Sequence, residues 1–61
     1  MNTRFFVEHN AQYMGIFKSL KCALNFIKRK GYTNDEDNLT YLLDSNGEFY
    51  DIHTGQIIDV E

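Results

Sequence analysis

The segment from Asp44 to Asp59 contains the side chains best suited to bind a metal ion: three aspartates, a glutamate and a histidine within sixteen positions. Carboxylate oxygens bind hard cations, and the calcium loop of an EF-hand needs a glycine at its sixth position and a glutamate at its twelfth. Counted from Asp44, the first glycine is the fourth residue and Gly55 is the twelfth. The pattern does not match a calcium loop, and we expect no metal site.

The same segment contains two turn signals. Asn46-Gly47 is typical of a two-residue type I′ hairpin turn, because both residues tolerate a positive φ. Thr54-Gly55 resembles such a turn as well. We therefore interpret the polar residues of this segment as turn residues and solvated strand ends.

Histidines and one cysteine are the remaining candidates for catalysis. Asp51 and His53 are two positions apart, so on a strand their side chains share a face, and the carboxylate could orient the imidazole. The nucleophile would have to be Cys22, whose neighbour one helical turn earlier is Lys18. Nothing in the sequence brings Cys22 close to a histidine. We expect no enzymatic activity and no cofactor; a small hydrolase built on His9 or His53 is the most distant alternative.

Most of the chain has strand-like patterns. Aromatic and β-branched residues predict a first hairpin from Arg4–Glu8 and Tyr13–Phe17, in which Gly15 indicates a bulge or a close backbone approach. Three further strands are expected as a meander: Leu39–Leu43, Glu48–Ile52 and Gln56–Val60.

A helix is predicted between the first hairpin and the meander. Its apolar stripe has helical spacing and consists of Leu20, Ala23, Leu24 and Ile27. Ser19 is a suitable N-cap, and Gly31 can adopt the left-handed conformation that ends a helix. The polar residues 32–38 should form a loop.

These elements predict one α+β domain spanning residues 1–61, with a small antiparallel sheet in the order ββαβββ and one amphipathic helix on one face. A domain of this size has a marginal core. Its single cysteine excludes an intramolecular disulfide, no apolar run approaches the roughly 20 residues of a membrane span, and no signal peptide is evident. We expect an intracellular, cytoplasmic protein without membrane contact.

One apolar sheet face has no second helix to cover it. With two-residue turns, the face beneath the helix would hold Leu39, Tyr41, Leu43, Tyr50, Ile52 and Ile57. The other face would hold Leu42, Phe49, Ile58 and Val60. Contiguous exposed apolar patches usually mark contacts. We therefore predict a partner-binding surface at Leu42, Phe49 and Ile58, together with the off-stripe Phe26, used for another protein or for a homodimer.

Charge is divided along the chain. Residues 1–33 contain six basic residues and one acidic residue, whereas residues 34–61 contain eight acidic residues and no basic one. The basic helix residues Lys18, Lys21, Lys28 and Arg29 favour nucleic acid as an alternative partner, bound through its phosphates. No known nucleic-acid-binding motif accompanies them, so nucleic acid ranks below protein.

The chain resembles, over its whole length, the short early or accessory proteins of bacteriophages. The resemblance lies in hairpin turns such as DSNGEFYD and in the helix opening FKSLKCAL. It implies a small non-enzymatic regulator or inhibitor that binds a host protein in the host cytoplasm. No functional residue can be carried over from it.

Overall fold

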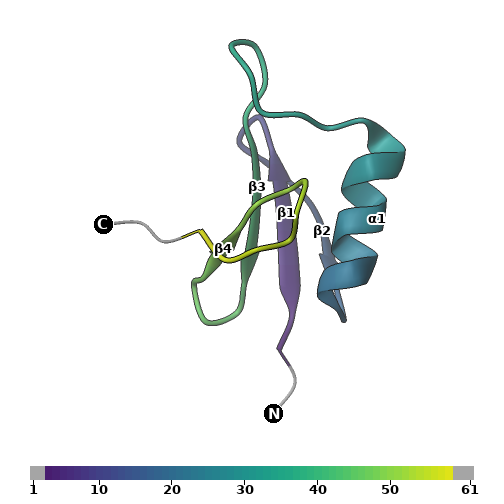
Figure 1. Ribbon diagram of the computed structural model, residues 1–61, viewed down its shortest axis with the longest axis vertical. Helices are drawn as coiled ribbons and strands as arrows, with labels where there is room; N and C mark the ends of the chain where they lie inside the picture. The colour runs from purple at the N-terminus through teal and green to yellow at the C-terminus, as the bar shows by residue number, and fades with distance from the viewer. Residues whose placement is uncertain (1–2, 59–61) are drawn as a thin grey trace.

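The computed structural model describes residues 3–58, which form one antiparallel sheet with a helix packed on one face (Figure 1). Its elements are β1 (Phe5–His9), β2 (Gln12–Phe17), α1 (Leu20–Lys30), β3 (Thr40–Asp44) and β4 (Phe49–Tyr50). The strand order across the sheet is β2-β1-β3-β4. The predicted α+β class is confirmed.

The first hairpin forms as predicted. Asn10 and Ala11 both have a positive φ, 51° and 68°, and connect β1 to β2 as a two-residue turn. The register shifts opposite Gly15, and the ring of Phe17 lies over this glycine: a Cβ there would be 3.3 Å from Phe17 Cζ. Gly15 therefore marks both a bulge and a close approach.

Helix α1 begins and ends where the sequence predicts. The Ser19 hydroxyl accepts a hydrogen bond from the Cys22 amide at 3.1 Å. Gly31 ends the helix with a φ of 73°, and its amide donates to the Lys28 carbonyl. The predicted apolar stripe packs on the sheet, with Ala23 and Ile27 buried.

The β3–β4 turn is one residue longer than predicted. Leu43 pairs with Phe49 and not with Tyr50, so three residues form the turn. Gly47 has a φ of 87°, whereas Asn46 has no positive φ. The predicted type I′ turn is therefore wrong, and a one-residue shift of register exchanges the faces on which side chains lie.

A buried carboxylate holds the longer turn. Asp44, 5% exposed, accepts hydrogen bonds at Oδ1 from the amides of Asn46 and Glu48, at 2.9 and 3.0 Å. The Tyr50 hydroxyl donates to Oδ2 at 2.7 Å. This hydrogen bond, which has the largest effect, and those from the turn amides lower the pKa of Asp44, and the Tyr50–Asp44 contact raises the pKa of Tyr50 to about 12.

Within the described residues, the predicted last strand, Gln56–Val60, appears as one isolated bridge. Ile57 pairs with Tyr50, the Asp51 amide donates to the Gln56 carbonyl, and the Ile58 amide donates to the Phe49 carbonyl. Val60 lies outside the described residues.

The core lies between the helix and the sheet and consists of Val7, Ala23, Ile27, Leu42 and Ile52. Val7 pairs with Leu42, and both are 0% exposed. The prediction that Leu42 belongs to an uncovered surface is therefore wrong, because Leu42 lies in the core on the helix side of the sheet.

Three residues predicted beneath the helix are instead exposed: Leu39, Tyr41 and Ile57. Tyr41 alternates with Leu42 along β3, so it must lie on the opposite face. Tyr50 and Ile52 do lie on the helix side, with Ile52 in the core and Tyr50 packed against it.

Candidate interaction surface

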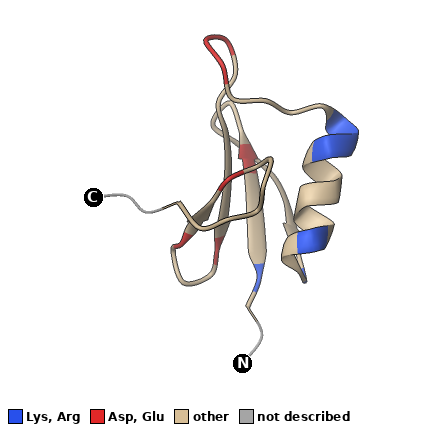
Figure 2. Ribbon diagram, in the orientation of Figure 1, with Lys and Arg blue, Asp and Glu red and all other residues tan. Residues whose placement is uncertain are grey.

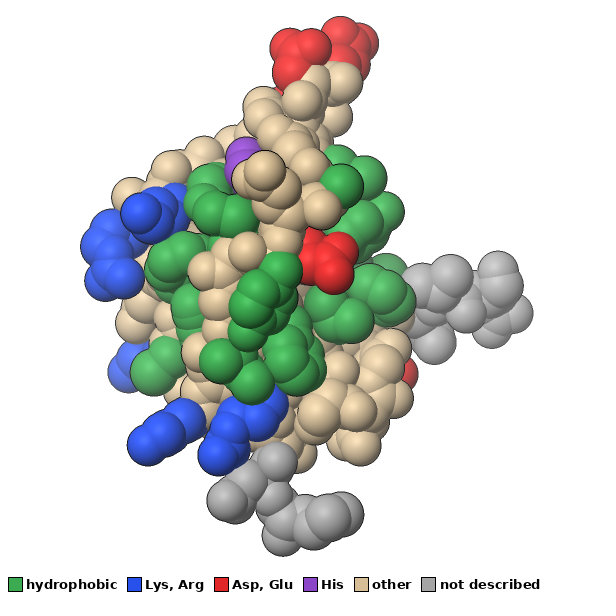
Figure 3. Space-filling view, turned by 180° about the vertical axis from the view of Figure 1, so that it is seen from behind, with side chains coloured by type: hydrophobic (Ala, Val, Ile, Leu, Met, Phe, Trp, Pro, Cys, Tyr) green, Lys and Arg blue, Asp and Glu red, His purple; other side chains and the backbone are tan. Residues whose placement is uncertain are grey.

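The sheet face opposite the helix carries seven large apolar side chains and the carboxylate of Glu8. Because side chains along a strand alternate between faces, residues that alternate with buried Val7 and Leu42 lie on this side. We call it the outer face; its members are Phe6, Glu8, Tyr13, Ile16, Tyr41, Leu43, Phe49 and Ile58. Figure 3 shows hydrophobic side chains gathered on this side of the molecule.

Strand pairing arranges most of these residues in a straight row. Phe6 pairs with Ile16 on β2 and with Leu43 on β3, and Leu43 pairs with Phe49 on β4. Ile58 continues the row, since its amide donates to the Phe49 carbonyl at 2.8 Å. We call these five residues the apolar row. The row crosses every strand of the sheet.

A second row contains the carboxylate of the outer face. Glu8 pairs with Tyr13 on β2 and with Tyr41 on β3, so a tyrosine flanks it on each side. Tyr13 is 62% exposed and Tyr41 is 42% exposed. Within residues 3–58, none of the side-chain hydrogen bonds involves the Glu8 carboxylate. We call Tyr13, Glu8 and Tyr41 the acidic row.

Basic residues lie beyond the other side of the apolar row. Arg4 continues the ladder of β1, because the Ser45 amide donates to the Arg4 carbonyl at 2.9 Å. Strand alternation places Arg4 on the same face as Glu8. Lys18, just after β2, is exposed. In Figure 3, basic side chains border the lower edge of the hydrophobic patch, and an acidic side chain borders it on another side.

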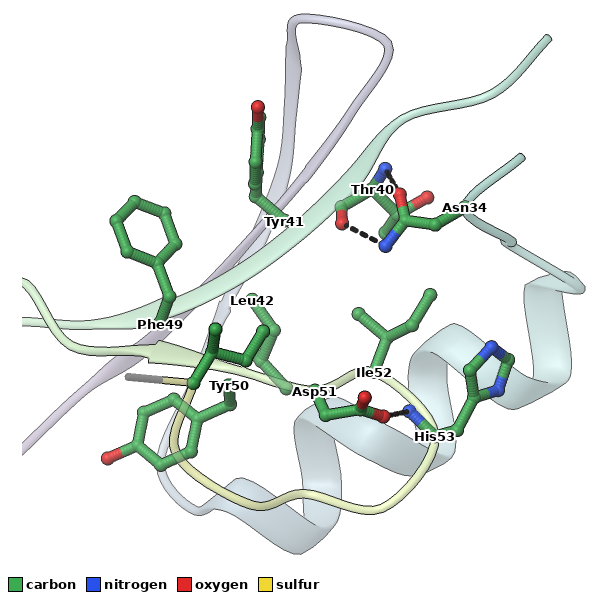
Figure 4. A pocket seen from close by; sticks show the side chains of 10 residues that line it. Asn34, Thr40, Tyr41, Leu42, Phe49, Tyr50, Asp51, Ile52 and His53 are labelled. Carbon is green, nitrogen blue, oxygen red and sulfur yellow. Dashed lines mark hydrogen bonds between the residues drawn. The ribbon is translucent and has the colours of Figure 1, made fainter. Parts of the chain in front are cut away.

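A hollow of about 450 Å³ opens where β3 extends past the short β4. Its lining residues include Tyr41, Phe49 and Ile58 of the outer face, and Leu42 and Ile52 of the core. The rings of Tyr41 and Phe49 are 5.7 Å apart in an edge-on arrangement. Figure 4 shows both rings on the same side of β3 and β4. The hollow is large enough for a partner's side chain.

An asparagine closes the open edge of β3 beside this hollow. The Asn34 amide nitrogen donates to the Thr40 carbonyl at 3.0 Å, and its oxygen accepts from the Thr40 amide (Figure 4). A side chain thus takes the place of a neighbouring strand. On the other edge of the sheet, the bulge in β2 interrupts the strand. Both devices hinder the addition of a foreign strand, which favours the outer face over the edges for contact.

Asp51, also at the hollow, has a structural role. Its Oδ1 accepts the backbone amides of His53 at 2.7 Å and Thr54 at 2.9 Å. These bonds lower the pKa of Asp51, with the Thr54 amide contributing most. The contact joins Asp51 to the backbone of His53 and not to its ring, so the pair that the sequence suggested holds a turn.

His9 also takes part in a structural network. Its Nδ1 is 3.0 Å from Thr40 Oγ1, which donates its own proton to the Thr33 carbonyl, so Nδ1 must be the donor. The ring stacks on Tyr32 with centroids 3.9 Å apart. Thr40 is 2% exposed, so this network secures the loop before β3.

The other candidates for chemistry are dispersed. Cys22 is free and exposed on α1. Within residues 3–58, no three His, Cys, Asp or Glu residues form a group that could hold a metal ion.

Most basic residues of the helix region form a surface separate from the outer face. Lys18, Lys21, Lys28 and Arg29 are all exposed. Figure 2 shows basic positions at both ends of α1, whereas acidic positions lie on the sheet and on the loop at residues 35–37. Lys21, Lys28 and Arg29 therefore surround the helix, whereas Lys18, just after β2, also borders the apolar row.

Phe26 does not extend the outer face. It is half-buried on the helix side of the sheet, with ring centroids 4.9 Å from Phe17 and 5.9 Å from Tyr32. The Lys30 ammonium lies 5.7 Å from its ring centroid. Of the four residues predicted for partner binding, Phe49 and Ile58 lie on the outer face, whereas Leu42 and Phe26 pack on the helix side.

Sequence reasoning missed the β1 and β2 half of this surface, including Phe6, Glu8, Tyr13 and Ile16. Those residues come together because β1 pairs with both β2 and β3. Alternation of side chains around Val7 on β1 was the sequence signal that places Phe6 and Glu8 on the face opposite Val7. The bulge before Gly15 hid the corresponding pattern in β2.

Comparisons with known proteins add no relative. No family model matches the chain, and neither the search of curated proteins nor that of solved structures found a match. In the described part of the chain, α1 is not long and apolar enough to cross a membrane.

Proposed function

We propose that this domain is a non-enzymatic protein-binding module, which regulates or inhibits the protein that it contacts through the outer face. The observation that carries this proposal is the uncovered apolar row with its exposed aromatic neighbours. Tyr13, Ile16, Tyr41 and Ile58 are each between 42% and 62% exposed. Apolar patches of this kind are typical of contact sites.

The composition of the outer face also favours protein contact over catalysis. Tyrosine and phenylalanine supply much of the contact area at protein interfaces, because their rigid rings lose little entropy on binding. The hollow beside Tyr41 and Phe49 would accept an apolar side chain of the partner. The histidines and the buried Asp44, by contrast, are used in turns and loops.

The resemblance to phage accessory proteins favours a host protein as the target. The target must offer an apolar surface for the apolar row, a cation for Glu8 and an acid for Arg4. These three requirements define its chemistry without naming it.

Site-specific photocrosslinking in cells tests this function. A photoreactive benzoylphenylalanine replaces Tyr13 on the outer face or, as a matched control, Lys21 on the exposed side of α1. We expect crosslinked protein products from position 13 and few from position 21. Products from position 21 alone would contradict the proposal and favour the basic helix as the working surface.

A further inference from the structure

The two ends of the outer face carry opposite charges on the same strand. Glu8 lies in the acidic row on one side of the apolar row, and Arg4 lies on the other side, with Phe6 of the apolar row midway between them on β1. Such a surface is self-complementary when it meets a copy of itself turned by 180°. Homodimers use this kind of isologous contact, in which residue i meets j and j meets i.

We propose that the outer face binds the outer face of a second copy of this chain, with the strands of the two sheets antiparallel. This inference rests on the proposed function, because it names a partner for the same surface. The twofold axis would run along the apolar row. The result is a two-layer sandwich of sheets, for which a separation of about 10 Å is usual.

Register determines which residues meet across this axis. A rotation about the apolar row keeps each strand over its counterpart and exchanges the two ends of the strand. Phe6 therefore meets Phe6 of the second copy, and Glu8 meets Arg4 of the second copy. Because the contact is symmetric, this ion pair forms twice.

The same rotation matches the flanking residues on β2. Tyr13, 62% exposed, comes opposite Lys18 of the second copy, which is also exposed. A lysine ammonium over a tyrosine ring is a favourable cation–π contact. On β3, Tyr41 comes opposite Ser45 of the second copy, so no like charges meet.

The charge pattern also rejects the other way of stacking two outer faces. A twofold axis parallel to the strands would place the acidic row against the acidic row and Arg4 near the second copy's Arg4. Glu8 would then be desolvated without a cation, which is costly. In the antiparallel arrangement Glu8 and Arg4 each meet a residue of opposite charge.

A different target would have to present the same pattern of base, apolar row and acid. It would then displace the second copy, so self-association and target binding exclude each other at this face. A weak dimer, in equilibrium with monomer, suits such an exchange.

Sedimentation equilibrium on the full chain, from about 10 µM to about 1 mM, tests the dimer by charge reversal. We expect a reversible monomer–dimer equilibrium for the wild type. Glu8→Arg and Arg4→Glu should each raise the dissociation constant by about tenfold or more, because each reversal creates two repulsive contacts. The matched control Lys21→Glu, on α1, should leave it within about twofold.

Two rescues keep the test independent of any folding defect. The double variant Glu8→Arg/Arg4→Glu restores both ion pairs and should return to near wild-type association. An equimolar mixture of the two single variants should form heterodimers, since a Glu8→Arg chain opposite an Arg4→Glu chain has an ion pair in both contacts. Failure of both rescues, with all chains folded by circular dichroism, would overturn the antiparallel arrangement.

A wild type that stays monomeric up to about 1 mM would overturn the dimer itself. The proposed function would survive that result if position 13 still crosslinks to another protein in cells. Conversely, a rescued dimer with no other crosslinked protein would support the dimer and contradict the host-target proposal.

Discussion

The two faces of the sheet treat their polar groups differently. On the helix side, Thr40 and Asp44 are buried and each has several hydrogen-bond partners within the chain. On the outer face, Glu8 lies between two tyrosines with no side-chain hydrogen bond among the described residues. The buried polar groups on the helix side thus find their hydrogen-bond partners within the chain. Glu8, which has no hydrogen-bond partner among the described side chains, lies on the face that we assign to a partner outside the chain.

The largest expected contrast is between two adjacent leucines. Leu42→Ala should lower the free energy of unfolding by about 3–5 kcal/mol, because it leaves a cavity in the core. Leu43→Ala, on the outer face, should cost about 1 kcal/mol or less. Urea denaturation followed by circular dichroism measures both. Equal losses would contradict the assignment of faces, and a larger loss for Leu43→Ala would restore the register predicted from a two-residue turn.

The next contrast compares a carboxylate that is hydrogen-bonded within the chain, Asp44, with one that has no side-chain hydrogen bond within residues 3–58, Glu8. Tyr50→Phe removes the 2.7 Å hydrogen bond to buried Asp44 and should cost about 1–3 kcal/mol. Glu8→Gln should change stability by less than about 0.5 kcal/mol. Thermal unfolding of the two variants checks this. A large loss for Glu8→Gln would mean that Glu8 stabilises the fold, which would contradict its assignment to an ion pair with a partner.

The pKa shifts predict where this protein loses stability. The folded-state pKa values of Asp35, Asp44 and Asp51 all lie below their ordinary values, chiefly because each accepts backbone or side-chain hydrogen bonds. Such groups stabilise the fold fully above their unfolded pKa of about 4, and that stability is lost as the pH falls through the folded pKa. Tyr50 acts in the opposite sense: its contribution is complete below about pH 10 and is lost as the pH rises towards its folded pKa of about 12.

Chemical denaturation at several pH values from about 2 to about 12 would measure both effects. We expect a plateau between about pH 5 and about pH 9 that declines on each side. In Tyr50→Phe the alkaline decline should weaken. An unchanged alkaline decline would show that the hydrogen bond to Asp44 does not control it.

Charge reversal on the helix should have the smallest effect. Lys28 and Arg29 lie in the last turn of α1, where they oppose the negative end of the helix dipole. Lys28→Glu/Arg29→Glu should lower stability by about 1 kcal/mol or less and leave the dissociation constant of the dimer unchanged. If the double variant instead loses a salt-sensitive affinity for DNA or RNA, the nucleic-acid alternative gains support.

Local sequence signals predicted local structure well. Ser19 and Gly31 define the helix, and the polar stretch after β1 becomes a turn, because each depends on neighbouring residues alone. The prediction of the β3–β4 turn was wrong because Asp44 accepts two amide hydrogen bonds and thereby stabilises a three-residue turn. Asn46-Gly47 suits that turn as well, since only Gly47 needs a positive φ.

The candidate surface was predictable only in part. An uncovered apolar face followed from one short helix beside many apolar strand residues, and Phe49 and Ile58 were placed on it. Leu42 was assigned to the wrong face together with the register, and alternation around Val7 gave the face of Glu8 but not its position between Tyr13 and Tyr41, which depends on the pairing of β1 with β2 and β3. Long-range pairing decided which residues share a face, and no local signal in the sequence reports it.

Amide chemical shifts across a dilution series, on uniformly ¹⁵N-labelled protein, test the outer face most directly. We expect that raising the concentration to about 1 mM shifts resonances of Phe6, Glu8, Ile16 and Leu43, while those of Lys21 and Lys28 stay unchanged. Shifts confined to α1, or outer-face resonances that do not depend on concentration, would contradict the assignment of the outer face as the contact surface.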